Sequence, residues 1–284
     1  MAFAGDLSCL CGVLLRREDK IMEIIKQFGL QRSGTNALRG IIEVNLDLRV
    51  AANILGDKHS SISWAAMEDW AAEMPLPKSL SPKDYNRLLD ALHGRTLKFI
   101  LSVKDPVSWV NSYFRYSKKK FEHKNPEKIL DFTTRFAEKS LFSWQERMKS
   151  YADFIAQNAG QCFVVQHEKL LISPESVLAD FCRKFDFPFP DDPELFLEGY
   201  ARRGTDEQQG DMLINRKMRF NRDFHLEGQW MRDMPEDVLE QAVAFRDDVF
   251  GRHPEIRSLF DVETIGLTVA APSRKLSSGA TRPA

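Results

Sequence analysis

A buried strand, a polar glycine loop and an amphipathic helix follow one another early in the chain, and this succession restricts the fold most. Residues 21–30 (IMEIIKQFGL) form an apolar-rich run that is typical of a buried strand. The polar residues 31–36 (QRSGTN) come next, and Leu38, Ile41 and Ile42 then recur at helical spacing. A strand that leads through such a loop into a helix is the building unit of parallel α/β sheets.

Two more segments repeat this arrangement. Residues 97–103 (LKFILSV) predict a second buried strand, which a loop at 104–106 closes before a helix expected over 107–115. Residues 162–165 predict a third strand. Apolar helix faces lie between and after these strands, at Trp144, Met148, Tyr151 and Ile155 and at Leu178, Phe181, Cys182 and Phe185. We therefore expect an α/β fold with three layers (α/β/α) around a central parallel sheet, whose site lies at the carboxyl ends of the strands.

The length of the chain favours one core with additions at both ends. In 284 residues, 43% are hydrophobic, which is enough for a single large domain, and we place that domain over residues 21–271. Residues 1–20 are expected to form an N-terminal arm, and the small polar residues 272–284 a disordered tail.

Cysteine use and hydropathy indicate the compartment. The four cysteines suggest no disulfide framework, and no run reaches the roughly 18 apolar residues that a membrane span needs. We expect a cytoplasmic protein without a transmembrane segment. The apolar run at residues 7–15 precedes its basic pair, whereas a signal peptide has its positive charge first, so we interpret the run as a loosely attached arm. The alternatives are an anchor or a signal, with association with the cytoplasmic face of a membrane.

The balance of charges requires any anion to be bound locally. The chain has 40 Lys and Arg against 41 Asp and Glu, so its net charge of −1 gives no general attraction for nucleic acid. Gly29 to Thr35 has the G-x4-G frame of a phosphate-binding loop, which cradles anionic oxygens at a helix N-terminus. A Walker loop places Lys directly after the second glycine, whereas this chain has Thr35 there and its cation earlier, at Arg32. This difference argues against kinase or ATPase chemistry.

Three motifs together resemble the sulfotransferases that use 3′-phosphoadenosine 5′-phosphosulfate (PAPS), especially the bacterial members. The loop at 29–36 (GLQRSGTN) looks like the family's phosphosulfate loop. Lys104-Asp105-Pro106, followed by Ser112 eight positions after Lys104, matches the family's 3′-phosphate signature in type and spacing. Residues 165–170 (VQHEKL) and the Pro-Glu pair at 174–175 resemble a third motif, of mainly structural role, with His167 in place of the usual Tyr.

The resemblance implies a P-loop-like sulfotransferase fold and a transfer of sulfuryl from PAPS to an acceptor hydroxyl, which leaves 3′-phosphoadenosine 5′-phosphate (PAP). The acceptor implied by the bacterial members is a carbohydrate or a glycolipid. Arg32 is expected to stabilise the leaving phosphate. The residues implied in donor binding are Arg32, Ser33, Gly34, Thr35, Asn36, Lys104 and Ser112, with Arg216 and Lys217 as a closing segment in which Met218 replaces the family's glycine.

The general base is expected at Lys58-His59. This pair follows about two dozen residues after the loop and resembles the neighbouring Lys and His of cytosolic members. A neutral imidazole, with an ordinary pKa of about 6.5, suits proton removal near neutral pH. Glu68 and His93 are reserve candidates. Lys118 to Lys120 is interpreted as a solvated helix face, with contact to an acidic substrate or to the nucleotide as the alternative.

Two other functions stay open at this point. One is a P-loop nucleotide kinase or NTPase with an atypical loop, which needs a loop lysine and a strand-end carboxylate for Mg²⁺. The other is a non-catalytic nucleotide-binding protein of the same fold. No metal is expected, because sulfuryl transfer requires none and no metal-ligand spacing is recognisable in the sequence.

Overall fold

The computed structural model describes residues 23–77, 80–127, 130–195, 201–202, 212–213, 229–261 and 263–265. The arm expected over 1–20, the tail expected over 272–284, and the pair Arg216 and Lys217 all lie outside these residues. The division of the chain into arm, domain and tail therefore stays a prediction.

Four parallel strands form the central sheet, in the order β2-β1-β3-β4. They span Glu23–Gly29 (β1), Leu48–Ala51 (β2), Lys98–Val103 (β3) and Cys162–Gln166 (β4), so the three strands predicted from the sequence are confirmed and β2 is added. Gly29 pairs with Ser102, and Val103 pairs with Gln166, so β1, β3 and β4 end at one edge of the sheet. The loops that leave this carboxyl edge are the ones that the sequence motifs occupy.

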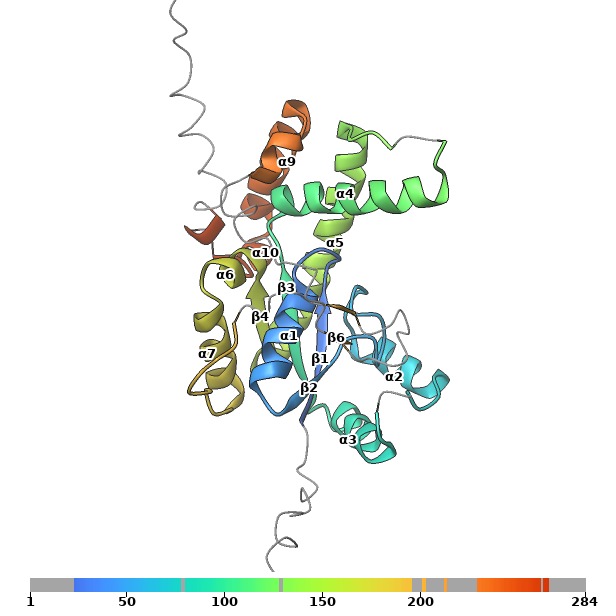
Figure 1. Cartoon of the computed structure of the whole chain (residues 1–284), viewed down its shortest axis with the longest axis vertical. Coiled ribbons are helices and arrows are strands. Elements are labelled where there is room, and N and C mark those ends of the chain that lie inside the picture. The colour runs from blue at the N-terminus through green and yellow to red at the C-terminus, as the bar shows by residue number, and fades with distance from the viewer. Residues whose placement is uncertain are drawn as a thin grey trace, which may run out of the picture.

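Helices cover both faces of the sheet, which confirms the three-layer α/β/α architecture (Figure 1). One face carries α1 (Thr35–Asn45), α6 (His167–Ile172) and α7 (Pro174–Phe185). The other face carries α2 (Trp64–Glu73), α3 (Pro82–His93), α4 (Pro106–Lys124), α5 (Thr134–Asn158), α9 (Glu236–Arg252) and α10 (Pro254–Arg257). The short elements are η1 (Ala159–Gln161), η2 (Gln229–Asp233) and the antiparallel pair β5 (Ala201–Arg202) and β6 (Met212–Leu213).

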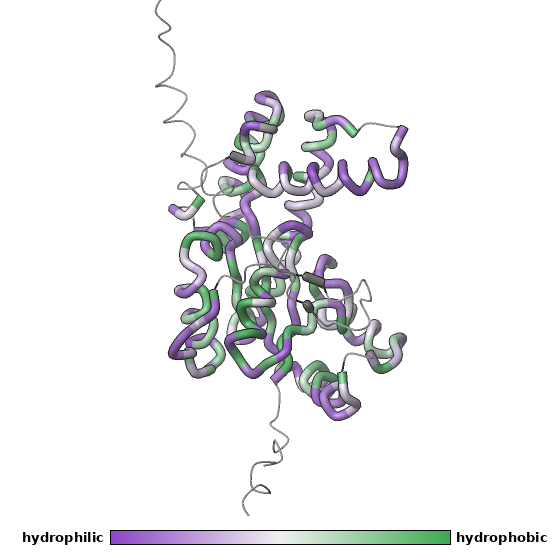
Figure 2. The backbone as a smooth tube through the Cα atoms, viewed as in Figure 1, coloured by the Kyte–Doolittle hydropathy of each residue, from purple (hydrophilic) through white to green (hydrophobic). Residues whose placement is uncertain are grey.

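Two hydrophobic cores lie on the two faces, because successive side chains of a strand point to opposite sides. In β3, Phe99 and Leu101 enter the core beneath α5, whereas Ile100 enters the core beneath α1 and α7. Phe99 meets Phe154 edge to face, with ring centroids 5.0 Å apart. The helix face predicted at Trp144, Met148 and Tyr151 is fully buried in the same core. Figure 2 shows this distribution as green tube in the interior and purple tube on the outer helices.

Helix α4 is longer than the sequence pattern predicts. Asp105 caps its first turn, because Asp105 Oδ1 accepts hydrogen bonds from the N–H groups of Val107 and Ser108. The helix then continues to Lys124, well past the predicted end at residue 115. Its polar second half has no apolar periodicity to mark it, although Lys and Glu are good helix formers. None of the helices in the described ranges is long and apolar enough to cross a membrane.

Candidate active site

The loop between β1 and α1 is folded tightly at the carboxyl edge of the sheet. Arg32 and Gly34 have left-handed backbone conformations, with φ values of 69° and 77°. The Ser33 hydroxyl donates a hydrogen bond to the Leu30 carbonyl at 2.7 Å, and Gln27 Nε2 donates to the Thr35 carbonyl at 2.9 Å. Gly34 is the N-cap residue of α1, so the loop ends at a helix N-terminus, where positive partial charge attracts anions. This geometry suits a phosphate or a sulfate group.

Glycine is required at both ends of this loop. A Cβ on Gly29 would lie 2.6 Å from Thr35 Cγ2 and 2.8 Å from Ser102 Cβ. A Cβ on Gly34 would overlap Nδ1 of His167, which therefore packs directly against the loop. The positions that carry the G-x4-G frame are thus fixed by close packing as well as by backbone conformation.

We predict that Gly34→Ala lowers the free energy of unfolding by about 1–3 kcal/mol, because it combines a left-handed backbone with a steric overlap. The matched control is Gly251→Ala in α9, where a Cβ would meet no atom within 4 Å. That substitution should leave stability unchanged or raise it by about 0.5–1 kcal/mol, since Ala is the better helix former. Urea unfolding of both variants measures the difference, and equal midpoints for Gly34→Ala and the wild type would contradict the packing described here.

Arg32 is the cation of this loop. Its side chain is exposed, and the carbonyl of the preceding Gln31 accepts a hydrogen bond from Trp109 Nε1 at 2.8 Å, which fixes the loop against α4. Partial desolvation of its guanidinium lowers the pKa of Arg32. The charge of Tyr116 opposes this shift, and the charge of Arg115 adds to it. A guanidinium stays protonated in proteins, so Arg32 is charged at neutral pH.

Lys104 and Ser112 meet at the end of β3. Lys104 is buried, and its Nζ donates a hydrogen bond to Ser112 Oγ at 2.9 Å. Burial lowers the pKa of Lys104 to about 8, an effect that Glu168 and Asp105 oppose and that Arg32 strengthens. The backbone is also held, because Trp144 Nε1 donates to the Lys104 carbonyl at 2.9 Å. The structure therefore brings together the two residues whose spacing matches the 3′-phosphate signature.

Two buried carboxylates, Glu168 and Asp105, lie at the turn between β3 and α4. Glu168 Oε1 accepts hydrogen bonds from Ser108 Oγ at 2.8 Å and from the Asp105 N–H at 3.3 Å. Burial, and then the negative Glu168, raise the pKa of Asp105 to about 7, while Arg246 and two backbone N–H groups lower it. Arg246 Nη1 lies 3.9 Å from Asp105 Oδ2. The third sequence motif thus has a structural role here, whereas Arg246, which comes from distant α9, carries no signal in the sequence.

His59 and Lys58 lie beside the glycine loop. His59 Nδ1 lies 2.6 Å from the Gly29 carbonyl oxygen, and because a carbonyl only accepts, we assign the proton to Nδ1. Neutral His59 then keeps a lone pair on Nε2. Burial lowers the pKa of His59, the hydrogen bond to Gly29 raises it, and the adjacent Lys58 lowers it again. Lys58 Nζ donates to Asn36 Oδ1 at 2.7 Å, so this loop and α1 are joined.

Lys26 holds the loop that carries His59 and was not singled out from the sequence. It is fully buried in β1, and its Nζ donates to the carbonyls of Ala52 at 2.9 Å and Gly56 at 2.7 Å. A lysine within a strand that was expected to be buried was the available signal, because a buried charge needs specific partners.

The reserve candidates Glu68 and His93 lie at the opposite edge of the sheet. Glu68 pairs with Arg95 at 2.8 Å, and Arg95 precedes the amino end of β3. His93 is the last residue of α3, also before β3, and is exposed. Among the proton acceptors considered from the sequence, only His59 lies at the carboxyl edge with Arg32 and Lys104.

The assembled site has two cationic positions at the ends of neighbouring strands, with an imidazole beside the first. Arg32 lies after β1, and Lys104 with Ser112 lies after β3. In the part of the chain that the structure describes, no three His, Cys, Asp or Glu side chains are grouped so as to hold a metal ion. The arrangement is able to bind an anion with two separated phosphate groups and to accept a proton next to one of them.

Comparison with known proteins finds similar chains among solved structures. No protein-family model and no curated protein matches the chain. Among solved structures, a sulfotransferase domain from the curacin biosynthetic pathway is similar over 81% of this chain and 98% of that chain, with 14% sequence identity and a TM-score of 0.44.

Proposed function

We propose that this chain is a sulfotransferase that moves a sulfuryl group from PAPS to a hydroxyl of a carbohydrate or a glycolipid. The observation that carries the proposal is the pair of cationic positions at the ends of β1 and β3. PAPS has a phosphosulfate on its 5′ oxygen and a separate phosphate on its 3′ oxygen, so it needs two such positions. A nucleoside triphosphate instead extends along one loop, where a lysine reaches its β and γ phosphates, and this chain has Thr35 at that point.

In this proposal the loop residues 32–36 hold the phosphosulfate, and Lys104 with Ser112 holds the 3′-phosphate. Backbone N–H groups at the start of α1 and the Arg32 guanidinium supply the first site. The Lys104 ammonium and the Ser112 hydroxyl, already in contact, supply the second. Arg216 and Lys217 are proposed to close over the 3′-phosphate, as the family resemblance implies.

The chemical step forms a bond between the acceptor oxygen and sulfur and breaks the bond between sulfur and the 5′-phosphate oxygen. The acceptor proton passes to Nε2 of His59, whose Nδ1 is already committed to the Gly29 carbonyl. Negative charge develops on the phosphate of departing PAP, and Arg32 stabilises it. Lys58 takes part by holding Asn36 and by placing His59 beside the loop.

Because the pKa of Lys104 is about 8, we predict that the affinity of the wild-type protein for PAP falls as the pH rises above 8. Affinity falls because Lys104 loses its positive charge as the pH rises. For one titrating group, the affinity falls by at most about tenfold per pH unit. Lys104→Arg stays charged, so its affinity should be nearly constant from pH 7 to pH 10. Calorimetric titration at each pH tests this. A flat profile for the wild type, or the same decline in Lys104→Arg, would show that Lys104 does not hold the phosphate.

Transfer itself is tested with PAPS labelled with sulfur-35 and a panel of neutral and acidic cell-envelope glycans. The proposal predicts label on at least one glycan, with PAP formed in equal amount and without added Mg²⁺. If the protein instead hydrolyses ATP with Mg²⁺ and leaves PAPS intact, the proposal is wrong and the kinase or NTPase alternative holds. If it binds PAPS and consumes none with any acceptor, the non-catalytic alternative holds.

A further inference from the structure

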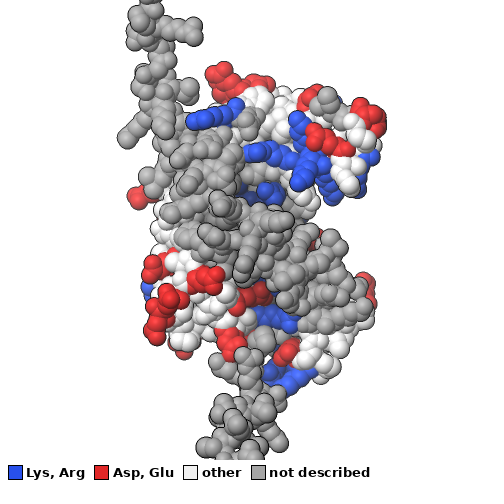
Figure 3. Space-filling view, in the orientation of Figure 1, with Lys and Arg blue, Asp and Glu red and all other residues white. Residues whose placement is uncertain are grey.

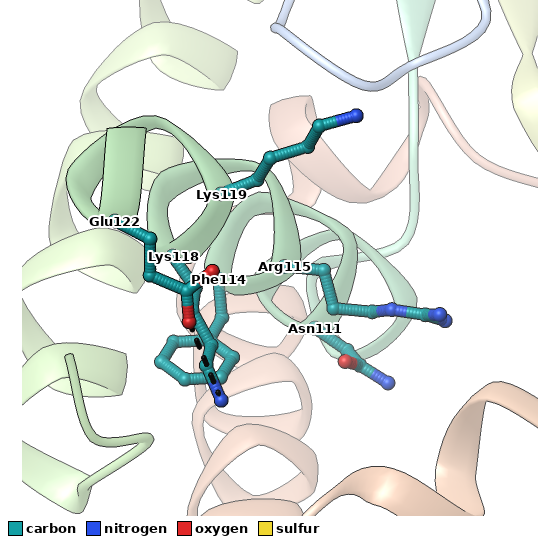
Figure 4. Close-up of a pocket in the computed structure, with 6 residues that line it drawn as sticks. All are labelled: Asn111, Phe114, Arg115, Lys118, Lys119 and Glu122. Carbon is teal, nitrogen blue, oxygen red and sulfur yellow. Dashed lines mark ion pairs between the residues drawn. The ribbon is translucent and has the colours of Figure 1, made fainter. Parts of the chain in front are cut away.

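A cationic groove lies along α4, outside the residues assigned to donor binding. The groove has a volume of about 440 Å³ and is lined by Asn111, Phe114, Arg115, Lys118, Lys119 and Glu122 (Figure 4). Three of these side chains are basic and one is acidic, in a chain whose net charge is −1. Figure 3 shows basic side chains gathered over this helix. Local excess charge of this kind attracts anions even when the whole molecule is nearly neutral.

The floor of the groove is fixed by packing. Phe114 is buried and stacks on Phe132, with ring centroids 4.2 Å apart and planes inclined by 8°. Asn111 is also buried, and its Nδ2 donates to the carbonyl of Trp230 in η2. Its Oδ1 makes no hydrogen bond within the described part of the chain. A rigid floor lowers the entropy lost when a ligand is bound by the charged side chains above it.

The acidic residue of the groove does not neutralise it. Glu122 Oε1 lies 4.0 Å from Lys118 Nζ, and the two side chains are 49% and 44% exposed. An ion pair at this distance in solvent contributes little. Figure 4 shows this pair at one side, with Arg115 and Lys119 extending away from it. Among the described residues that line the groove, the basic side chains therefore outnumber the acidic one.

The groove adjoins the proposed 3′-phosphate position, because its lining residue Asn111 directly precedes Ser112 in α4. Arg115 follows Ser112 by three residues, which is about 4.5 Å along a helix axis. Ser112 contacts Lys104, and the positive charge of Arg115 lowers the pKa of Arg32, in addition to the larger effect of burial. A molecule in the groove would thus lie beside the donor.

We propose that this groove binds carboxylate groups of the acceptor, so that the acceptor is an acidic saccharide and not a neutral sugar. The inference rests on the proposed sulfotransferase function and names the substrate class for the same site. Ammonium groups attract carboxylates, and Lys118 and Lys119 place two of them in succession along the groove. A volume of about 440 Å³ is in the range of small-ligand sites, which suits a few sugar rings.

The test compares tetragalacturonic acid with its fully methyl-esterified form, which has the same length and no charge. Calorimetry on the PAP-saturated protein at low salt should give at least about tenfold tighter binding of the acid. A Lys118→Gln/Lys119→Gln variant should reduce that preference to below about threefold. The matched control, Arg183→Gln/Lys184→Gln, removes two basic residues from α7 on the other face of the sheet and should keep the preference.

Equal affinity for the acid and the ester overturns the inference, and so does an α4 variant that binds the acid as tightly as the wild type. Sedimentation with phosphatidylglycerol vesicles tests a membrane surface as the occupant. If the α4 variant loses vesicle binding but still binds the acid normally, the groove binds a membrane surface and the inference is wrong. A prior PAP titration separates the two proposals, because failure to bind PAP contradicts the proposed function, whereas PAP binding without preference for the acid contradicts only the groove.

Discussion

Arg32→Ala is expected to lower kcat for sulfuryl transfer by about 10²- to 10³-fold, the usual loss when one preorganised group that faces developing charge is removed. Arg32 is the cation of the glycine loop, and its backbone is held in the left-handed region between Gly29 and the first turn of α1. The phosphate gains charge only as the bond to sulfur breaks. The variant should therefore lose much more in kcat than in affinity for the donor PAPS, which we expect to change by less than about tenfold.

Single-turnover measurements with labelled PAPS separate these two quantities. Arg183→Ala in α7 is the matched control, because Arg183 is exposed and pairs with Asp180 away from the site. Arg32→Lys should retain part of the activity, since a lysine keeps the charge but not the planar fork. A fall in kcat of less than tenfold for Arg32→Ala would mean that another group stabilises the leaving phosphate.

His59→Gln is expected to lower kcat by about 10²- to 10⁴-fold, the usual contribution of a general base. Glutamine has a side-chain amide in place of the ring, so it is able to hydrogen bond but not to take the proton. The wild-type profile adds a second test. Because burial lowers the pKa of His59, the neutral base persists below the ordinary value of 6.5, and the acidic limb of kcat/KM should lie below that pH.

The matched control is His93→Gln, since His93 is exposed at the opposite edge of the sheet. It should leave both kcat and the acidic limb unchanged. Retention of the wild-type pH profile by His59→Gln would show that the acceptor proton goes elsewhere.

Local sequence patterns predicted those elements of the fold that have strong local signals. The buried strands β1, β3 and β4 are runs of apolar residues, and the faces of α5 and α7 repeat at helical spacing. Strand β2 has only four residues, Leu48–Ala51, which is too short for a periodic signal. The second half of α4 is polar and exposed, so its length depends on helix propensity, which no hydrophobic pattern reveals.

In the site, too, residues with a local sequence motif were predicted, whereas residues that depend on tertiary contacts were not. The family resemblance named Lys104 and Ser112 from their spacing, and the structure places them in contact, while their role in donor binding stays a proposal. Lys26 and Arg246 were missed because their partners, the carbonyls at 52 and 56 and the carboxylate of Asp105, are distant in the sequence. The position of Lys26 in a predicted buried strand was a signal, but the partners of both residues depend on the fold and cannot be identified from a single sequence.

Lys104 carries the central claim, because it decides whether the second phosphate of the donor is recognised. The direct measurement is calorimetric titration with PAP and with adenosine 5′-phosphate, without Mg²⁺, in the wild type and in Lys104→Met. We expect PAP to bind the wild type about 100-fold more tightly than adenosine 5′-phosphate, since a charge-assisted contact contributes about 1.5–3 kcal/mol. The ratio should fall below about tenfold in Lys104→Met. Equal affinities for the two nucleotides in the wild type, or tighter binding of ATP with Mg²⁺, would contradict a PAPS-dependent sulfotransferase.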